Sequence, residues 1–71
     1  MMFLEFSTPD SGDPLFVDMD QVAAMAPDPG GRKTRLVFSG GFVLWVSGPV
    51  STILERIAAR EQGMLYREVD K

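Results

Sequence analysis

The chain has 71 residues, a formal net charge of −3, no cysteine and no histidine. Disulfide bonds and zinc sites built on cysteine and histidine are therefore excluded, and the common nucleophile–base pairs of enzymes are absent. A chain of this length forms one domain, and its core is small enough that oligomerisation is an expected source of stability. An apolar fraction of 45% is typical of a folded domain and too high for a disordered chain.

Charge is distributed unevenly along the chain. Residues 1–31 hold six acidic residues and no basic one, whereas residues 32–71 hold seven basic residues against four acidic ones. The ordinary interpretation is that the two halves neutralise each other in the folded state, and the alternative is a charged face for a partner. No apolar run is long enough to span a bilayer, and no basic segment typical of a secretion signal is present, so a reducing cytoplasm is the expected location.

The first part of the chain alternates between strand-forming and turn-forming residues. Strands are expected at residues 3–7, 15–17 and 22–26, and turns at residues 8–14, 18–21 and 27–33. Val22 and Met25 are three positions apart, not two. If both point inward, the strand that holds them contains a bulge or begins in a helical turn.

The clearest element is a β-hairpin. Thr34–Phe38 and Phe42–Val46 are two β-rich runs around Ser39–Gly41. A two-residue loop would divide the apolar residues of the hairpin between the two faces of the sheet. A three-residue loop with its last glycine in the left-handed conformation pairs Phe38 with Phe42 instead. We expect the three-residue loop, because register is set where one face is buried. The residues that it turns inward are Leu36, Phe38, Phe42, Leu44 and Val46.

One helix is predicted over Pro49–Gln62. Gly48 or Ser47 is the expected N-cap, proline suits the first helical position, and Gly63 is the expected stop. The apolar stripe that should pack on the sheet consists of Val50, Ile53, Leu54, Ile57 and Ala58. Residues 1–63 are thus predicted to form the domain, and residues 64–71 a C-terminal tail, either docked as a strand or frayed.

These elements predict a small α+β fold. It is an antiparallel β-meander sheet of four to five short strands with one C-terminal helix packed on one face. The connections between the strands are too short for parallel crossovers, so neighbouring strands should be antiparallel.

Few residues offer chemistry. Asp18 and Asp20 form a D-x-D pair that could ligate Mg²⁺ or Ca²⁺, but at a turn such a pair more often caps the local backbone. Gly30–Thr34 is faintly like the end of a phosphate-binding loop, but it lacks the required spacing and precedes a strand. We therefore expect no catalytic residues, no metal, no cofactor and no enzymatic activity.

The remaining candidate is a surface. If the hairpin residues above point to the core, Val37, Val43 and Trp45 point away from it, and the first strand turns Phe3 outward by the same alternation. A sheet with one wet face should alternate apolar with polar residues, and these strands do not. We predict an interaction face of Phe3, Val37, Val43 and Trp45 for a homo-oligomer or a protein partner. The alternative is that residues 64–66 or a curled sheet cover this face.

A nucleic-acid partner is the less favoured hypothesis. Arg32, Lys33 and Arg35 are clustered, and Trp45 could stack on a base. However, the chain is acidic overall, and affinity for the phosphate backbone is mostly electrostatic.

Two features of the sequence support a resemblance to a known family. The first is a strand, Leu36-Val37-Phe38, followed by a turn that ends in Gly41 and a second strand, Leu44-Trp45-Val46. The second is the helix with its apolar stripe. Over residues 15–58 the chain resembles the small FlbD/SwrD-type proteins associated with bacterial flagellar operons. It departs from their pattern at Pro9–Pro14, where the family has a tight Asn-Gly turn. The resemblance implies a non-enzymatic accessory to motility that acts through protein contacts, and a phage-derived protein is the related expectation.

Overall fold

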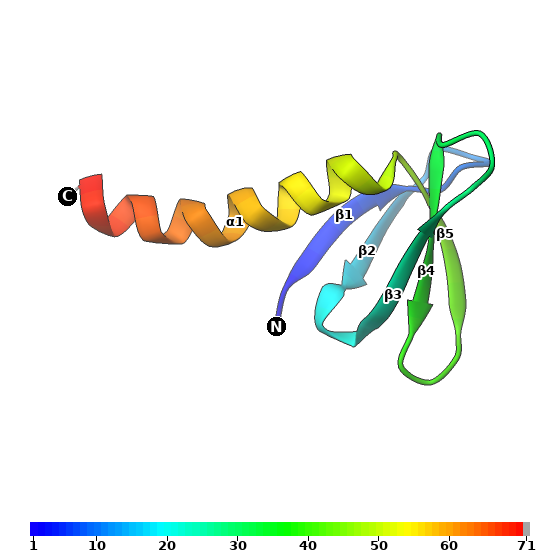
Figure 1. Cartoon of the computed structure of the whole chain (residues 1–71), viewed down its shortest axis with the longest axis horizontal. Coiled ribbons are helices and arrows are strands. Elements are labelled where there is room, and N and C mark those ends of the chain that lie inside the picture. Colours follow the sequence, from blue (N-terminus) through cyan, green and yellow to red (C-terminus); the bar gives the residue numbers. More distant parts are fainter. Residues whose placement is uncertain (71) are drawn as a thin grey trace.

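The computed structural model describes the backbone of residues 1–70 and the side chains of residues 1–61. Its elements are, in chain order, β1 (Phe3–Ser7), β2 (Pro14–Asp18), the 3₁₀ turn η1 (Met19–Gln21), β3 (Val22–Pro27), β4 (Lys33–Phe38), β5 (Val43–Ser47) and α1 (Val50–Asp70) (Figure 1). Every strand pair is antiparallel and joins strands that follow each other in the chain. The predicted α+β class, with a meander of short strands and one C-terminal helix, is confirmed.

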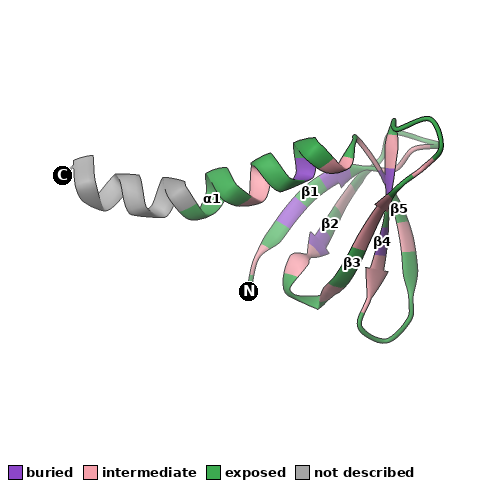
Figure 2. Ribbon diagram, in the orientation of Figure 1, coloured by how far each residue is buried: buried purple, intermediate pink, exposed green. Residues whose placement is uncertain are grey.

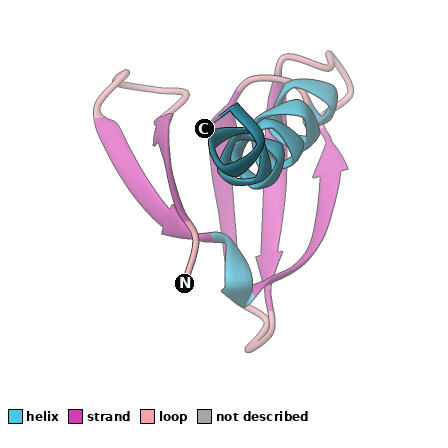
Figure 3. Cartoon of the chain, turned by 90° about the vertical axis from the view of Figure 1, so that its left-hand side faces the viewer, coloured by secondary structure: helices cyan, strands magenta, loops and turns pink. Residues whose placement is uncertain are grey.

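The strands divide into two sheets rather than one. β1 pairs with β2, and β3, β4 and β5 form a separate three-stranded sheet. The turn expected at residues 18–21 separates them, because the Asp18 carboxylate accepts a hydrogen bond from the Asp20 backbone N–H at 3.1 Å and starts η1. Asp18 of the D-x-D pair therefore caps the local backbone, whereas the Asp20 carboxylate forms an ion pair with the Met1 ammonium. Viewed end-on, the β1–β2 hairpin stands beside the larger sheet, and α1 lies in front of the strands (Figure 3).

Two local backbone features match the sequence-based expectation. Phe38 donates its backbone N–H to the Phe42 carbonyl at 2.8 Å, and Gly41, with a φ of +91°, donates to the Phe38 carbonyl at 2.8 Å. The three-residue hairpin loop closed by a left-handed glycine is thus confirmed. The expected bulge in β3 is also present, as a register shift between Val22 and Ala24.

One small core joins both sheets to the helix. Its buried apolar residues are Leu4, Phe6, Val17, Leu36, Val46 and Ile53 (Figure 2). Thr34 is buried with them, and its hydroxyl donates a hydrogen bond to the Gly48 carbonyl at 2.8 Å. Gly48 has a φ of +103°, which lets the chain turn from β5 into α1 directly beside the core.

Phe42 was expected in the core but is 63% exposed. Val46 is fully buried and Leu44 is half-buried, so exposure on this side of the hairpin increases toward its tip. The register is the expected one, but α1 seats over the opposite end of the hairpin. Phe42 is left to pack against Phe38, with 5.6 Å between ring centroids.

The face of α1 that contacts the strands is rotated from the predicted stripe. Ile53 is buried, and Val50 and Ile57 are half-buried, as expected. In contrast, Leu54 is 52% exposed and Ala58 is also exposed. The predicted stripe was therefore wrong along one flank.

Two arginines occupy the other flank of the helix. Arg56 donates from Nη2 to the Glu5 carbonyl at 2.7 Å, and Arg60 donates from Nη1 to the Phe3 carbonyl at 2.8 Å. The Arg56 guanidinium also lies over the Phe6 ring, 4.9 Å from its centroid. Their geometry fits, because four residues along a helix advance about 6 Å and two residues along a strand about 6.8 Å. The predicted apolar stripe does not include these two residues, but their guanidinium groups bond to the backbone of β1.

The helix starts and ends later than predicted. It begins at Val50, and the Pro49 carbonyl accepts a hydrogen bond from the Ile53 N–H at 3.3 Å. It continues through Gly63 to Asp70, so the expected stop at Gly63 and a docked C-terminal strand are not found. Glycine in a helix costs about 1 kcal/mol relative to alanine but does not forbid it, and good helix formers follow. Lys71 lies outside the described residues. So do the side chains of residues 64–66, which were the alternative cover for the predicted interaction face.

Ile53 and Leu54 are adjacent residues of one predicted stripe with opposite environments. We expect Ile53→Ala to lower the free energy of unfolding by about 2–5 kcal/mol, because it empties a core position. We expect Leu54→Ala to change it by less than about 1 kcal/mol, because that side chain is half in solvent. Urea denaturation followed by circular dichroism measures both, and equal losses would contradict the observed rotation of α1.

Candidate interaction surface

The three-stranded sheet has one face on the core and one face open. Thr34, Leu36 and Val46 point to the core and are fully buried. Their neighbours along each strand point the other way, because successive residues alternate between faces. We call this second surface the outer face. It consists of Ala24 and Ala26 from β3, Lys33, Arg35 and Val37 from β4, and Val43 and Trp45 from β5.

The apolar part of the outer face runs across all three strands. Ala24 lies opposite Val37, and Val37 lies opposite Val43 in the ladder. Trp45 follows on the same side of β5. Val43 is 43% exposed and Trp45 is 38% exposed, and alanine is too small to shield them. This surface is a contiguous apolar strip with a tryptophan at one end.

The basic part of the outer face surrounds that tryptophan. The Lys33 ammonium lies 5.2 Å from the centroid of the Trp45 ring, and Arg35 lies directly opposite Trp45 in the ladder. A cation over an exposed indole contributes about 0.5–1 kcal/mol. The strands thus place two positive charges and one large ring side by side.

Within residues 1–61, neither Lys33 nor Arg35 makes an ion-pair contact with an acidic side chain. Among side chains of residues 1–61, the single ion pair joins the Met1 ammonium to Asp20 at 3.2 Å. The expected neutralisation of the acidic half by the basic half therefore does not take the form of ion pairs in the part of the chain that the structure describes. Lys33 and Arg35 remain available on the outer face.

The four residues of the predicted interaction face do not form one surface. Val37, Val43 and Trp45 lie together on the outer face, with Val37 half-buried. Phe3 is 46% exposed but belongs to β1, in the other sheet. On the same face of that hairpin, opposite Glu5, lies Phe16, which is 65% exposed and was not predicted as part of an interaction face. Strand alternation could have found Phe16, because Val17 next to it points inward.

The loop between β3 and β4 fixes the start of the basic strand. The Asp28 carboxylate accepts hydrogen bonds from the backbone N–H groups of Arg32 at 3.0 Å and Lys33 at 3.3 Å. Desolvation acts to raise the pKa of this carboxyl, but the backbone N–H groups of Lys33, Arg32 and Gly31 and the Lys33 charge outweigh it and lower the pKa. The loop therefore favours the ionised carboxylate and holds Lys33 at the edge of the outer face.

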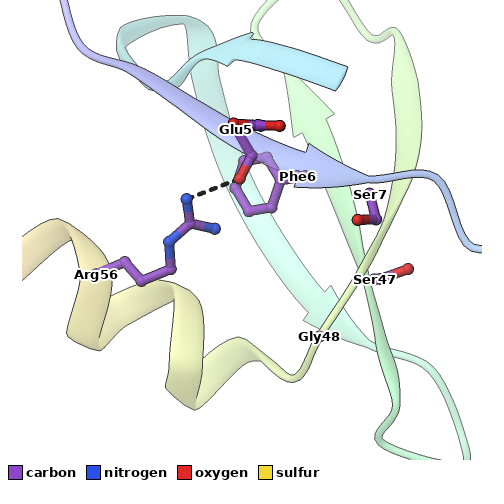
Figure 4. Close-up of a pocket in the computed structure, with 6 residues that line it drawn as sticks. All are labelled: Glu5, Phe6, Ser7, Ser47, Gly48 and Arg56. Carbon is purple, nitrogen blue, oxygen red and sulfur yellow. Dashed lines mark hydrogen bonds between the residues drawn. The ribbon is translucent and has the colours of Figure 1, made fainter. Parts of the chain in front are cut away.

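An open hollow lies on the other side of the molecule, between β1, β5 and the start of α1. It has a volume of about 360 Å³ and is lined by Glu5, Phe6, Ser7, Ser47, Gly48 and Arg56 (Figure 4). Arg56 is already bonded to the wall through the Glu5 carbonyl. No group of three or more acidic side chains within the described region is placed to hold a metal. The hollow offers a polar depression and no pair of reactive groups.

Comparison with known proteins gives no information about this surface, so its role is argued from its geometry. No family model, no curated protein and no solved structure matches the chain. The resemblance to FlbD/SwrD-type proteins stays a prediction. Within the residues described here, no helix is both long and apolar enough to cross a membrane.

The Asp28 hydrogen bonds give a pH prediction. Because the carboxyl pKa is lowered in the folded state, its contribution to stability is fully present above the unfolded-state pKa of about 3.9 and is lost as pH falls through the folded-state value. Asp28→Asn should therefore destabilise the protein at neutral pH, with a difference from wild type that shrinks below about pH 4. Thermal unfolding of both proteins between neutral and acid pH tests this, and a difference that does not vary with pH would contradict it.

Proposed function

We propose that this protein is a small, non-catalytic interaction module that binds a protein through its outer face. The observation that carries the proposal is the exposure of Trp45 and Val43, at 38% and 43%, on an uncovered sheet face. A buried tryptophan removes on the order of 150–250 Å² from water, which makes it an effective anchor for a partner. Contiguous apolar residues of this kind, rimmed by polar groups, usually mark interaction sites.

Further features agree with a binding role. The chain contains no histidine or cysteine to provide the usual nucleophile or base, and the hollow beside β1 has its arginine bonded to backbone. Lys33 and Arg35 form a charged rim beside that apolar strip. The finer assignment, an accessory to motility or a phage-derived accessory, is supported by the sequence resemblance alone, and a cytoplasmic location by the absence of an apolar run long enough to span a bilayer and of a basic segment typical of a secretion signal.

Trp45→Ala tests the proposal, with Phe16→Ala as a matched control on the other sheet. Phe16 is the more exposed aromatic residue, so general loss of surface hydrophobicity would affect the control at least as strongly. In pull-downs from a native lysate, wild type and Phe16→Ala should retain the same protein, identified by mass spectrometry, and Trp45→Ala should lose it. Retention by all three proteins would refute a role for the outer face.

A nucleic-acid partner is the second candidate, favoured by the placement of Lys33 and Arg35 beside Trp45. The Lys33 ammonium already lies over the ring on which a base would stack, and a two-cation surface gives a weak electrostatic attraction to phosphates.

Trp45 is the single tryptophan of the chain, so its fluorescence reports directly on this surface. We expect no quenching when single-stranded RNA or DNA is added at low salt, because the protein binds another protein. Quenching that is saturable and is reversed by added salt would favour the nucleic-acid hypothesis instead.

A further inference from the structure

The strand β5 has one free edge, and its hydrogen-bonding pattern can be assigned. The Phe42 carbonyl accepts a hydrogen bond from the backbone N–H of Phe38 in β4 at 2.8 Å. The Gly48 N–H donates to the carbonyl of Arg32, the residue before β4, also at 2.8 Å. In an antiparallel ladder, bonded pairs alternate with non-bonded pairs. Consequently Leu44 and Val46 bond to β4, whereas the N–H and C=O groups of Val43 and Trp45 point away from it. Among the described strands, β4 is the only hydrogen-bonded neighbour of β5.

The free edge of β1 is protected by the helix. Its outward carbonyls, those of Phe3 and Glu5, accept the hydrogen bonds from Arg60 and Arg56 described above. A strand from another molecule would have to displace both guanidinium groups in order to pair there.

The free edges of β2 and β3 carry other obstacles. β2 begins with Pro14, which has no N–H, and ends with the charged Asp18. β3 contains the bulge after Val22 and ends with Pro27, which again lacks a donor. Prolines, charges and bulges are the devices by which natural sheets prevent edge-to-edge pairing.

β5 has none of these devices. Its sequence, Val43-Leu44-Trp45-Val46-Ser47, contains no charge, no proline and no glycine, and no register shift interrupts its pairing with β4. An uncharged, regular edge strand with exposed apolar side chains is a template for another strand. The same two residues, Val43 and Trp45, supply the unpaired backbone groups and the exposed side chains.

We infer that β5 is a self-association edge at which two copies of this chain pair antiparallel, β5 against β5, into one continuous six-stranded sheet. Val43 lies opposite Trp45 of the second copy, and the twofold axis passes beside Leu44. Each such pair exchanges two backbone hydrogen bonds. The inference rests on the proposed function, since it names a second copy as the protein that binds here.

The register follows from what lies near the two ends of β5. Ser47 lines the hollow together with Ser7 of β1, so that end of the edge is flanked by the chain itself. Pairing centred on Trp45 would require Ser47, whereas pairing centred on Leu44 uses Val43 and Trp45 alone. On the outer face, each tryptophan then lies beside a valine of the other copy, an aromatic–β-branched pair that stabilises sheets.

Charge and size favour a second copy as the occupant. β5 carries no charge, so the two paired strands place no like charges directly opposite each other. The two β4 backbones would lie three strand spacings apart, about 14 Å. A single core of six buried apolar residues also gains from extension of its sheet.

Val43→Pro and Val43→Ala separate backbone pairing from side-chain packing. The proline removes the outward N–H without removing a bond to β4 and keeps most of the apolar side chain, whereas the alanine keeps the N–H and removes the side chain. Sedimentation equilibrium from micromolar to millimolar concentration should show a wild-type dimer. We expect Val43→Pro to weaken it at least about tenfold and Val43→Ala to weaken it less, about threefold.

Amide hydrogen exchange of the wild-type protein keeps the inference testable if Val43→Pro fails to fold by circular dichroism. The Val43 and Trp45 amides should exchange rapidly in dilute solution and become protected at high concentration, while the Phe16 amide on the other sheet should not change. A strictly monomeric wild type overturns the inference, as does a dimer in which these two amides stay unprotected or a folded Val43→Pro variant that dimerises like wild type.

The outcomes also separate this inference from the proposed function. If Trp45→Ala abolishes capture of a protein from lysate while the wild type is monomeric, the outer face is an interaction site and self-pairing at β5 is wrong. If Trp45→Ala leaves capture unchanged and the wild type is monomeric, both fail together.

Discussion

The two sheets of this protein share no hydrogen-bonded ladder, and among the described side chains of α1 it is Ile53 that is buried in the core that both sheets enclose. Everything else about the arrangement depends on how the first turns of α1 sit over that core. Gly48 makes the turn that brings the helix back onto the strands, and Thr34 bonds to the Gly48 carbonyl from inside the core. Farther along the helix, Arg56 and Arg60 hold the edge of β1. A small apolar contact and two charge-assisted hydrogen bonds thus join the hairpin to the sheet.

This arrangement leaves one side of the molecule uncovered. The chain has one helix among its described elements, and α1 occupies the inner side of the strands. The outer face of β3, β4 and β5 therefore meets solvent with Val43, Trp45 and the half-buried Val37 on it. Burial of apolar area is the main favourable term in association, which supports the proposal that the protein binds a partner through this strip. Lys33 and Arg35 form its charged rim.

The same arrangement protects some strand edges, but not all, against pairing with another strand. The arginines that dock α1 also occupy the outward carbonyls of β1, so one interaction both positions the helix and closes an edge. Prolines and the bulge protect β2 and β3. β5 joins directly to the helix through a short turn, and its edge carries neither a charge nor a helix side chain. The proposed interaction surface and the unprotected strand edge therefore both include Val43 and Trp45.

Much of this structure follows from local sequence. The positions of the strands, the left-handed Gly41, the three-residue hairpin loop, the bulge after Val22 and the single C-terminal helix are all encoded by turn chemistry and by the spacing of apolar residues over a few positions. Alternation likewise placed Val37, Val43 and Trp45 on one face, because the register of a hairpin is set within the hairpin itself.

Other features were decided by tertiary structure. The exposure of Phe42 depends on where α1 seats, which no local pattern specifies. The exclusion of Phe3 from the outer face follows from the separation of the strands into two sheets at η1. The helix turned Leu54 outward and Arg56 inward because the neighbouring strand edge offers free carbonyls, which a guanidinium can bind and leucine cannot. Gly63 did not end the helix, because a glycine lowers helix stability only modestly and the stop signal acts only where the chain must turn. The sequence by itself determined which segments pair and which side chains share a strand face. The three-dimensional packing decided which of those faces and edges remained open, since that depends on contacts between residues more than fifty positions apart.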